Sequence, residues 1–470
     1  MNLARHSISS TAPVLIFDAR FDADCHIFTA STQAGFAVYR TWPLQLLRKR
    51  EITGGTLAAV VPLHESSLLF LLGGGRSPRY PPNKVILWDD SLGQEVAELE
   101  FAERVRGLAC RRGWLVVALR RRIVVFQLGE KVARFGEWET YDNPRGLLAI
   151  ATAMHSTLLA VPGRQLGHVQ LIHLPPCPPS VPLGPPSSAH PASPAPSARK
   201  HPVSIIVAHD SALSTISVAP SGHLLATTSA RGTLIRIWDP ESGHQVREFR
   251  RGTDRAEIYG VAFRPDEKEV CAWSDKGTIH VFSLRGGSAS SNRQSTLAPL
   301  KPFLPLPNYF QSEWSYAQYR IPSQSAHISL SAPPSRPPTA DVVDEERCVV
   351  GWIQAPSDRQ EDTDQAPLME HQLIALTYTG GWYRLALPSS SASSARIPPF
   401  TSGSGAGAPI SASTPSVKAL SMDHPRSSSG SSFVGRLDKG KDRERNKEGK
   451  ESRECVLREF RRFGRWDGWG

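Results

Sequence analysis

Short apolar segments recur along the chain and are bounded by glycine, aspartate, serine or proline. Within them apolar and polar residues alternate, as in VLIFDARF, KVILWDD, RIVVFQL, TLIRIWD and TIHVFSL. Alternation with a period of two is typical of β-strands that bury one face, and no stretch has the 3.6-residue period of a long amphipathic helix. The sequence therefore predicts an all-β protein.

One bulky or apolar residue in each segment marks a repeating unit. The seven markers are Tyr39, Trp88, Phe126, Ile172, Trp238, Phe282 and Ala386, at spacings of 49, 38, 46, 66, 44 and 104 residues. Trp88 and Trp238 are followed by aspartate, as in WD repeats of about 40–45 residues. Seven units predict a seven-bladed, WD40-like β-propeller over residues 12–387, after an N-terminal extension of residues 1–11.

Stretches rich in proline and serine explain the long spacings. The 66-residue spacing contains an insert at 174–200, and the 104-residue spacing contains two expected loops, 284–307 and 332–365. Residues 388–454 are rich in serine and then in charge, so we expect a disordered insert. Residues 455–470 regain alternation and predict a last strand for blade seven. The blade can contain such a long insert because the entropic cost of closing a loop grows only logarithmically with its length.

Several function classes lack support in the sequence. The six cysteines are scattered without CxxC spacing, which argues against a zinc site and a disulfide framework and favours reduced thiols in the cytoplasm. The segment Gly73–Arg76 lacks the Gly-Lys-Ser/Thr of a phosphate-binding loop, and no histidine spacing or nucleophile elbow is present. We expect no enzyme activity, no cofactor, no metal and no membrane-spanning segment.

The net charge of +10, from 54 basic and 44 acidic residues, favours an anionic partner. Nucleic acid, a membrane surface and an acidic protein all meet this description. A nucleic-acid surface is disfavoured because the sequence lacks an interleaved stripe of aromatic and basic residues.

Two adjacent arginines, Arg250 and Arg251, stand in the segment Phe249–Gly252, FRRG, near the end of an expected strand. Adjacent residues on a strand point to opposite faces, so each guanidinium is expected to complete a separate anion site, where it can fork onto phosphate oxygens. Further donors follow in SARGTLIR and SDKGTIH, which share one spacing. They are His209, Ser229, Thr233 and Arg236 for one site, and Ser274, Thr278 and His280 for the other. The alternative is that these side chains only satisfy propeller backbone groups, as in ordinary WD repeats.

The FRRG segment, following TLIRIWD, resembles the signature of the PROPPINs, the WIPI-like propellers. The segments GGGRSPRYPPNKVILWDD and SEWSYAQYRIP also resemble that family, in the branch of the human WIPI three and four proteins and the fungal swollen-vacuole-phenotype-like proteins. The resemblance covers most of residues 12–387; the proline insert and the serine tail depart from it. It implies a monomeric, non-enzymatic effector of phosphatidylinositol 3-phosphate and phosphatidylinositol 3,5-bisphosphate, with the two sites above as its lipid pockets. It also implies recruitment of autophagy proteins and a peripheral location on vacuole, vesicle or endosome, and preautophagosomal membranes.

The expected loop 284–307 mixes basic residues with leucine and phenylalanine. This composition suits a loop that enters an anionic membrane interface, and we expect Leu300, Phe303 and Leu304 to insert. The alternative is a connector whose leucines pack on the propeller. The rival for the whole chain is a WD-repeat scaffold that binds proteins and no lipid.

Two further expectations concern the proposed sites. Rim arginines are expected to be exposed, so that replacing both leaves the fold intact. Histidines with an ordinary pKa of about 6.5 are expected to become charged on acidification and to tighten phosphate binding.

Overall fold

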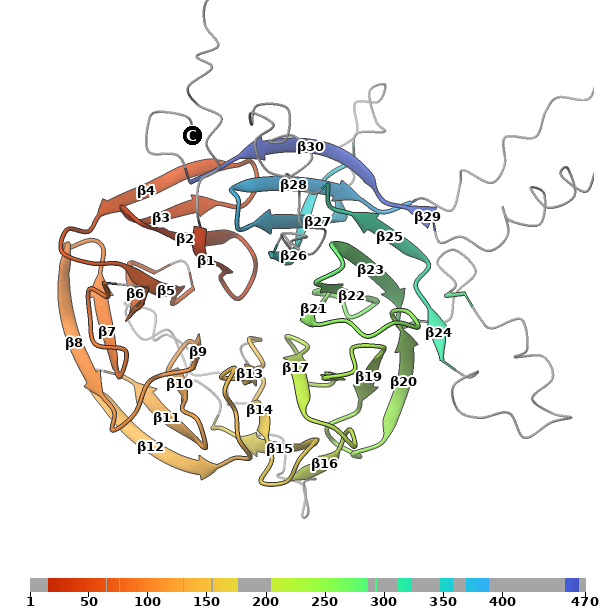
Figure 1. The fold of residues 1–470 in the computed structure, drawn as a ribbon, viewed down its shortest axis with the longest axis horizontal. Helices are drawn as coiled ribbons and strands as arrows, with labels where there is room; N and C mark the ends of the chain where they lie inside the picture. The colour runs from red at the N-terminus through yellow and green to blue at the C-terminus, as the bar shows by residue number, and fades with distance from the viewer. Residues whose placement is uncertain are drawn as a thin grey trace, which may run out of the picture. The chain divides into compact units, whose positions relative to one another are not determined.

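The computed structural model describes residues 16–64, 66–75, 77–129, 131–153, 155–175, 204–285, 292–293, 312–322, 347–357, 369–388 and 453–464. Within these ranges every regular element is a β-strand. The strands form seven separate sheets, which stand around a central axis as the blades of a ring (Figure 1). The expectation of an all-β, seven-bladed propeller is therefore confirmed.

The first four blades follow the chain in order. Blade one contains β1 (Ile16–Phe21), β2 (Ile27–Thr32), β3 (Gly35–Arg40) and β4 (Gln45–Glu51); blade two contains β5 (Leu57–Pro62), β6 (Leu68–Gly73), β7 (Lys84–Asp89) and β8 (Gln94–Glu100); blade three contains β9 (Gly107–Arg111), β10 (Trp114–Ala118), β11 (Arg122–Leu128) and β12 (Val132–Glu139); blade four contains β13 (Ala149–Ile150), β14 (Leu158–Pro162), β15 (His168–His173) and β16 (Ile205–Val207).

Of the last three blades, blade five and blade six each carry one additional short strand. Blade five contains β17 (Leu213–Val218), β18 (Leu225–Ser229), β19 (Leu234–Trp238) and β20 (Gln245–Arg250); blade six contains β21 (Ile258–Phe263), β22 (Glu269–Ser274), β23 (Thr278–Ser283) and β25 (Ala317–Arg320); blade seven contains β26 (Cys348–Pro356), β27 (Met369–Thr377), β28 (Gly381–Ala386) and β30 (Val456–Arg462). The short β24 (Glu313–Trp314) pairs in parallel with β20, and β29 (Arg453–Glu454) pairs in parallel with β25.

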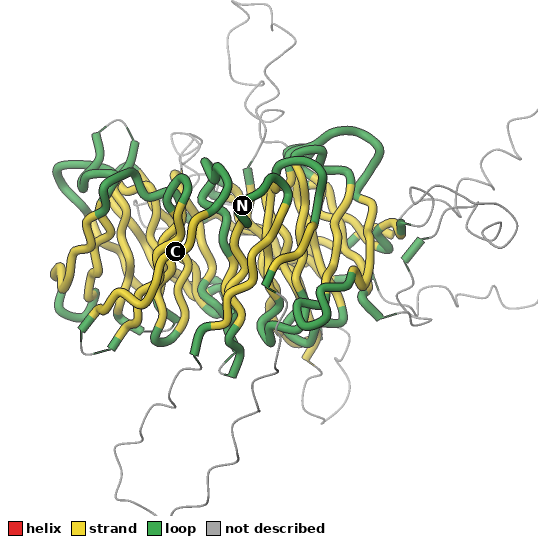
Figure 2. The backbone as a smooth tube through the Cα atoms, turned by 90° about the horizontal axis from the view of Figure 1, so that it is seen from below, coloured by secondary structure: helices red, strands yellow, loops and turns green. Residues whose placement is uncertain are grey.

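Each of the seven sequence markers lies on the third strand of its own blade, from Tyr39 on β3 to Ala386 on β28. Burial decreases from the inner strands to the outer ones: β10 is buried at all five positions, whereas β12 is exposed at five of eight. Loops gather at the two faces of the ring, and the strands run between them (Figure 2).

The chain closes the ring with its C-terminal segment. β30 is the outermost strand of blade seven, beside β28. Beyond it, the buried Phe463 packs edge-on against Phe28 and Tyr39 of blade one, and the backbone N–H of Gly464 donates to the Tyr39 hydroxyl at 3.0 Å. Contacts with blade one therefore hold Phe463 and Gly464, which follow β30.

Indole N–H groups connect neighbouring blades. Trp273 of blade six donates to the Cys348 carbonyl of blade seven at 2.8 Å, and Trp352 of blade seven donates back to the Ala262 carbonyl at 3.0 Å. Each bond satisfies a buried donor, and leaving such a donor unpaired costs about 1–3 kcal/mol.

The expectation of a loop over residues 332–365 is partly wrong. Cys348–Pro356 within it forms β26, the inner strand of blade seven. Its alternating sequence, CVVGWIQAP, lies between stretches rich in proline, serine and charge, which conceal the strand when composition is averaged over the whole interval. Likewise the charged run ending at residue 454 closes with a strand, since Arg453–Glu454 is β29.

The described cysteines form no disulfide. Burial raises the pKa of the Cys25, Cys110 and Cys455 thiols to about 12, so they are protonated at neutral pH. The parts of the chain that the structure describes contain no helix of the length and apolarity needed to cross a membrane.

Candidate anion-binding site

The FRRG segment lies at the junction of blades five and six. Phe249, near the end of β20, is fully buried and stacks on Phe282 of β23, with ring centroids 4.8 Å apart. This contact fixes the position of the two arginines that follow it.

Arg250 ends β20 and is covered by the segment that leads into the outer strand of blade six. Its Nε donates to the Ser312 hydroxyl at 2.9 Å, and its guanidinium lies over the Trp314 ring. β24 brings these residues there, because Arg250 pairs in register with Trp314. Arg250 is only 2% exposed, so the expectation of an exposed rim arginine is wrong here.

Arg251 is held by backbone groups. Its N–H donates to the Thr233 carbonyl at 3.0 Å, its Nε donates to the Gly232 carbonyl at 2.8 Å, and its Nη2 donates to the Asp254 carbonyl. The side chain is also buried, with 8% exposure. Burial lowers the pKa of Arg251, against the attraction of Asp275 and Asp254.

The strand register places Arg250 on the same face of blade five as Arg236. Arg236 pairs with Glu248, and Leu234 pairs with Arg250 two residues along. Residues two apart on a strand share a face. The Nε of Arg236 is already bound to Glu248 at 3.0 Å, and its Nη1 donates to the Ala208 carbonyl at 2.7 Å.

The face opposite to Arg250 packs against blade six. Phe249 lies on this face and contacts Phe282, as described above. Burial, together with the charge of Arg251, lowers the pKa of His280 of blade six. The two adjacent arginines thus have different neighbours.

His209 belongs to a hydrogen-bonded chain inside the propeller. The Trp238 indole donates to the Thr227 hydroxyl at 2.9 Å, and the same hydroxyl lies 3.0 Å from His209 Nε2. A hydroxyl that accepts the indole N–H can donate its own hydrogen to the imidazole. This arrangement matches the alternative in which such residues stabilise the blade.

His280 is likewise buried, and its Nδ1 lies 3.1 Å from the Ser315 hydroxyl. Thr278 and His280 share a face of β23, and the register sets them opposite Arg320 and Gln318 of β25. Ser274 is buried at the end of β22, where its hydroxyl accepts from the Lys276 N–H.

Of the first expected group, Ser229 and Arg236 lie on the face that carries Arg250, one on β18 and one on β19. Thr233 instead binds the backbone of Arg251 through its carbonyl. In the second group, Ser274, Thr278 and His280 share the face of blade six that contacts blade five, and the Ser274 hydroxyl accepts from the N–H of Lys276 in its own loop.

The expected titration of the histidines is wrong. Burial, with the nearby Arg236, lowers the pKa of His209 to about 4, and burial, with Arg251, lowers the pKa of His280 to about 4. Both rings are therefore neutral between pH 6 and pH 7.5, and no histidine-driven tightening is expected in that interval.

The partners that residues 312–320 supply were not predicted from the sequence. These residues are Ser312, Trp314, Ser315, Gln318 and Arg320. All lie in SEWSYAQYRIP, and pairing that segment with TIHVFSL as neighbouring strands sets Arg320 opposite Thr278.

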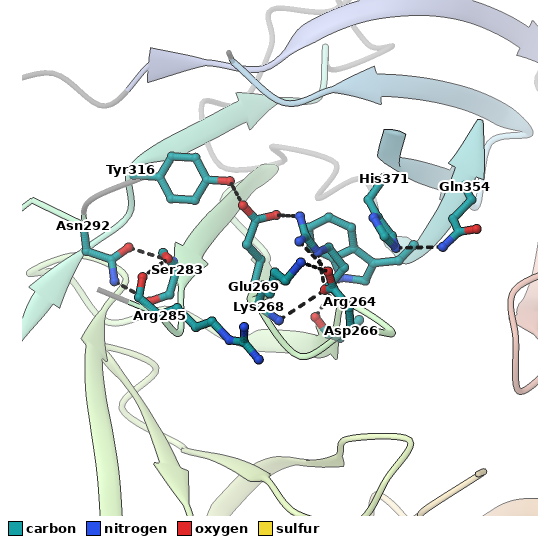
Figure 3. A network of polar contacts seen from close by, with 12 residues as sticks. Arg264, Asp266, Lys268, Glu269, Ser283, Arg285, Asn292, Tyr316, Gln354 and His371 are labelled. Atoms are coloured by element: carbon teal, nitrogen blue, oxygen red, sulfur yellow. Dashed lines mark hydrogen bonds and ion pairs between the residues drawn. The ribbon is translucent and has the colours of Figure 1, made fainter. Parts of the chain in front are cut away.

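The base of the expected blade-six loop contacts the same segment. Arg293 and Trp314 exchange backbone hydrogen bonds of 3.2 and 2.8 Å, and Asn292 donates to the Glu313 carboxylate at 2.7 Å. Asn292 also binds the backbone of Ser283 (Figure 3). The loop base, the covering segment and Arg250 thus form one connected structure. Leu300, Phe303 and Leu304 lie outside the described residues.

A second network of polar contacts holds Tyr316, which directly precedes β25. Tyr316 donates its hydroxyl to Glu269 at 2.6 Å, and Arg264 binds the other oxygen of Glu269 at 2.9 Å and also pairs with Asp266 (Figure 3). Burial raises the pKa of Glu269. The outer strand of blade six is therefore fixed to β22.

Seven blades with paired arginines between blades five and six define a WD40-like propeller with a buried basic junction. A family model described as PROPPIN matches residues 197–314, which include both arginines. SVP1-like protein 2 of Pichia angusta is 33% identical over 67% of this chain and 83% of its own length, and autophagy-related protein 18e of Arabidopsis thaliana is 35% identical over 65% and 75%. The chain belongs to the PROPPIN family.

Solved structures share the fold. Kluyveromyces lactis Hsv2 aligns with a TM-score of 0.54 at 21% identity, over 79% of this chain and 93% of its own. A complex of KlAtg21 with the coiled coil of AgAtg16 aligns with a TM-score of 0.52 at 16% identity, over 80% and 95%.

Proposed function

We propose that the chain is a peripheral effector of phosphatidylinositol 3-phosphate and phosphatidylinositol 3,5-bisphosphate, with two headgroup sites that flank Arg250 and Arg251. Membership of the PROPPIN family implies phosphoinositide binding. The observation that carries the two-site proposal is that these adjacent guanidinium groups have separate sets of partners.

The first site takes the face of blade five that carries Ser229, Arg236 and Arg250. A headgroup phosphate that binds Arg250 replaces the Ser312 hydroxyl as the acceptor of its Nε hydrogen. Such a phosphate forms charge-assisted hydrogen bonds, which are about twice as strong as neutral ones.

The second site lies between blades five and six and contains Arg251, Ser274, Thr278 and His280. Neutral His280 contributes a hydrogen bond rather than a charge. Arg320, which ends β25 opposite Thr278, adds a further cation. Asp275 attracts Arg251 and competes with an anion for it.

The cellular role follows from the relatives. Autophagy-related protein 18e and the complex with the Atg16 coiled coil support a role in autophagy, with recruitment of autophagy proteins. We place the chain on vacuole, endosome or vesicle, and preautophagosomal membranes, where phosphatidylinositol 3-phosphate recruits it.

A protein-binding scaffold without lipid binding is the second candidate. It is favoured by the internal partners of two expected ligands, since His209 is bound within the Trp238–Thr227 chain and Arg236 pairs with Glu248. If the protein is such a scaffold, its localisation should not change when both arginines are altered. If it is a lipid effector, the same double variant should leave the membrane.

Calorimetry with soluble inositol 1,3-bisphosphate tests the two-site proposal. Because both arginines are buried, lysine is the suitable replacement, since it keeps the charge and loses the fork. We expect a stoichiometry of two for the native chain, one for Arg250→Lys or Arg251→Lys, and no binding for the double variant. Each single variant also loses about 10²–10⁴ in vesicle affinity as the two sites cease to act together.

Arg247→Lys is the matched control, because Arg247 lies on β20 and pairs with Glu313 at 3.1 Å. It should keep both sites. A native stoichiometry of one, or a folded double variant that still binds, contradicts the proposal.

A further inference from the structure

The outermost strands of the blades differ in charge around the ring. β30 of blade seven carries Arg458, Arg461 and Arg462 against Glu459, and β4 of blade one carries Arg48, Lys49 and Arg50 against Glu51. The outer strands of blades two and three are acidic: β8 has three glutamates and no basic residue, and β12 has two glutamates and one arginine. The described ring therefore has a basic edge at blades seven and one and an acidic edge at blades two and three.

β30 also exposes apolar side chains among its arginines. Val456, Leu457 and Phe460 are 48%, 43% and 45% exposed. A single exposed apolar residue is ordinary on a protein surface. Three within five positions, on a strand that also carries three arginines, provide the combination that favours an anionic membrane interface, where apolar groups enter the acyl boundary and cations contact lipid phosphates.

The strip is continuous with the blade that carries the second proposed site. β29 pairs in parallel with β25, the strand that bears Gln318 and Arg320, and the chain passes directly from β29 into β30. Figure 1 shows β30 along the outer edge of the ring between β25 and β4. A bilayer that meets blade six edge-on can therefore also meet β30.

We propose that β30 is a second membrane-contact surface, which binds anionic bilayer lipids without headgroup selectivity. Val456, Leu457 and Phe460 enter the interface, and Arg458, Arg461 and Arg462 lie against lipid phosphates. The inference rests on the proposed lipid-effector function and adds a contact to it: blade seven meets the bilayer beside blade six, and the acidic blades two and three face away from it.

The ring contains a closely matched control for this strip. Phe460 of β30 and Phe135 of β12 are both 45% exposed, and each packs on one inner aromatic ring at 4.8 Å, Tyr383 and Trp114 respectively. Phe460 is followed by Arg461, which pairs with Glu459 of β30. Phe135 is preceded by Arg134, which pairs with Glu137 of β12. The same two substitutions can thus be made on opposite edges of the ring.

The experiment compares Phe460→Ser/Arg461→Gln with Phe135→Ser/Arg134→Gln in the full chain. The probes are vesicles of phosphatidylcholine and phosphatidylserine, with and without phosphatidylinositol 3-phosphate, together with soluble inositol 1,3-bisphosphate. The β30 variant should lose about tenfold in affinity for both kinds of vesicle and none for the soluble headgroup. The β12 variant should stay within about twofold of the native chain throughout.

A second β30 variant, Arg461→Gln/Arg462→Gln, keeps the Phe460–Tyr383 contact and tests charge alone. Its loss should shrink at high salt, because screening weakens the contribution of exposed charges. Vesicle binding unchanged in both β30 variants overturns the proposal. So does equal loss in the β12 variant, or loss of soluble-headgroup binding in a β30 variant.

The outcomes separate this inference from the proposed function. If the native chain does not bind inositol 1,3-bisphosphate, the headgroup proposal fails, while a β30-dependent loss on phosphatidylserine vesicles still supports the strip. If β30 binds a soluble polyglutamate and native affinity for anionic vesicles is independent of the strip, β30 serves an acidic protein and the inference is wrong.

Discussion

The guanidinium carbon of Arg250 lies 5.8 Å from the centre of the Trp314 ring. Sixty-four positions separate the two residues along the chain, yet they are paired in register through the two-residue strand β24. Trp314 in turn exchanges backbone hydrogen bonds with Arg293 at the base of the blade-six loop. An arginine proposed to bind a headgroup and a loop proposed to enter the membrane are therefore linked through one tryptophan.

We expect Ser312→Ala to increase affinity for the soluble headgroup. The Ser312 hydroxyl occupies the Nε hydrogen of Arg250, and removing this competitor lowers the cost of placing a phosphate there. One neutral-acceptor hydrogen bond is worth about 1 kcal/mol, or about fivefold in affinity. Calorimetry on Ser312→Ala measures the change. Ser242→Ala, which removes a surface hydroxyl bonded to Asp239, should have no effect, and a weaker affinity for Ser312→Ala would mean that this hydroxyl belongs to the site.

We expect headgroup binding to change the tryptophan emission of the protein through Trp314. A phosphate at Arg250 draws the guanidinium away from the indole face and alters the local field. Trp314→Phe should remove most of the change in emission while keeping a stoichiometry near two. Phe282→Tyr adds a hydroxyl beside Phe249, on the face of blade five opposite to Arg250. This variant should keep the change in emission. If Trp314→Phe keeps the full signal, the ligand does not reach this arginine.

Much of the fold could be predicted from short-range pattern. The period-two segments and the spacing of bulky residues identify seven blades because each blade repeats the same core, and every marker lies on a third strand. β26 was hidden because its nine residues lie within stretches rich in proline, serine and charge. β24 and β29 have two residues each, which is too short for any periodicity to show.

The separate neighbours of Arg250 and Arg251 follow from strand alternation, but their burial does not. Arg250 is covered by Ser312 and Trp314, which reach it through long-range parallel pairing. No local pattern in FRRG indicates that cover. The histidine pKa values also depend on burial by distant strands, as at His280, so sequence alone suggested ordinary titration.

We expect the two buried histidines to make folding stability sensitive to acid. An unfolded histidine binds a proton near pH 6.5, whereas His209 and His280 do so only near pH 4 in the fold. The unfolded state therefore binds more protons between these values, and stability is full above about pH 6.5 and is lost as the pH falls toward 4. Each histidine should account for about 2 kcal/mol between pH 8 and pH 5.

Urea unfolding of His280→Gln at several pH values measures this contribution. The variant should lose less stability on acidification than the native chain, whatever its stability at pH 8. His223→Gln, on the exposed surface, should keep the native slope. An unchanged slope in His280→Gln would show that this imidazole titrates alike in both states.

The last prediction concerns Leu300, Phe303 and Leu304. If these residues enter the bilayer, replacing all three by serine removes apolar area from the interface and should weaken vesicle binding by at least about tenfold. Binding of the soluble headgroup should not change, because Asn292 and Arg293 hold the loop base to Glu313 and Trp314 without these residues. Cosedimentation with vesicles and calorimetry with inositol 1,3-bisphosphate give the two readouts. Equal loss in both assays would show that the loop supports the Arg250 site through its base, and no loss in either would make the loop a connector between strands.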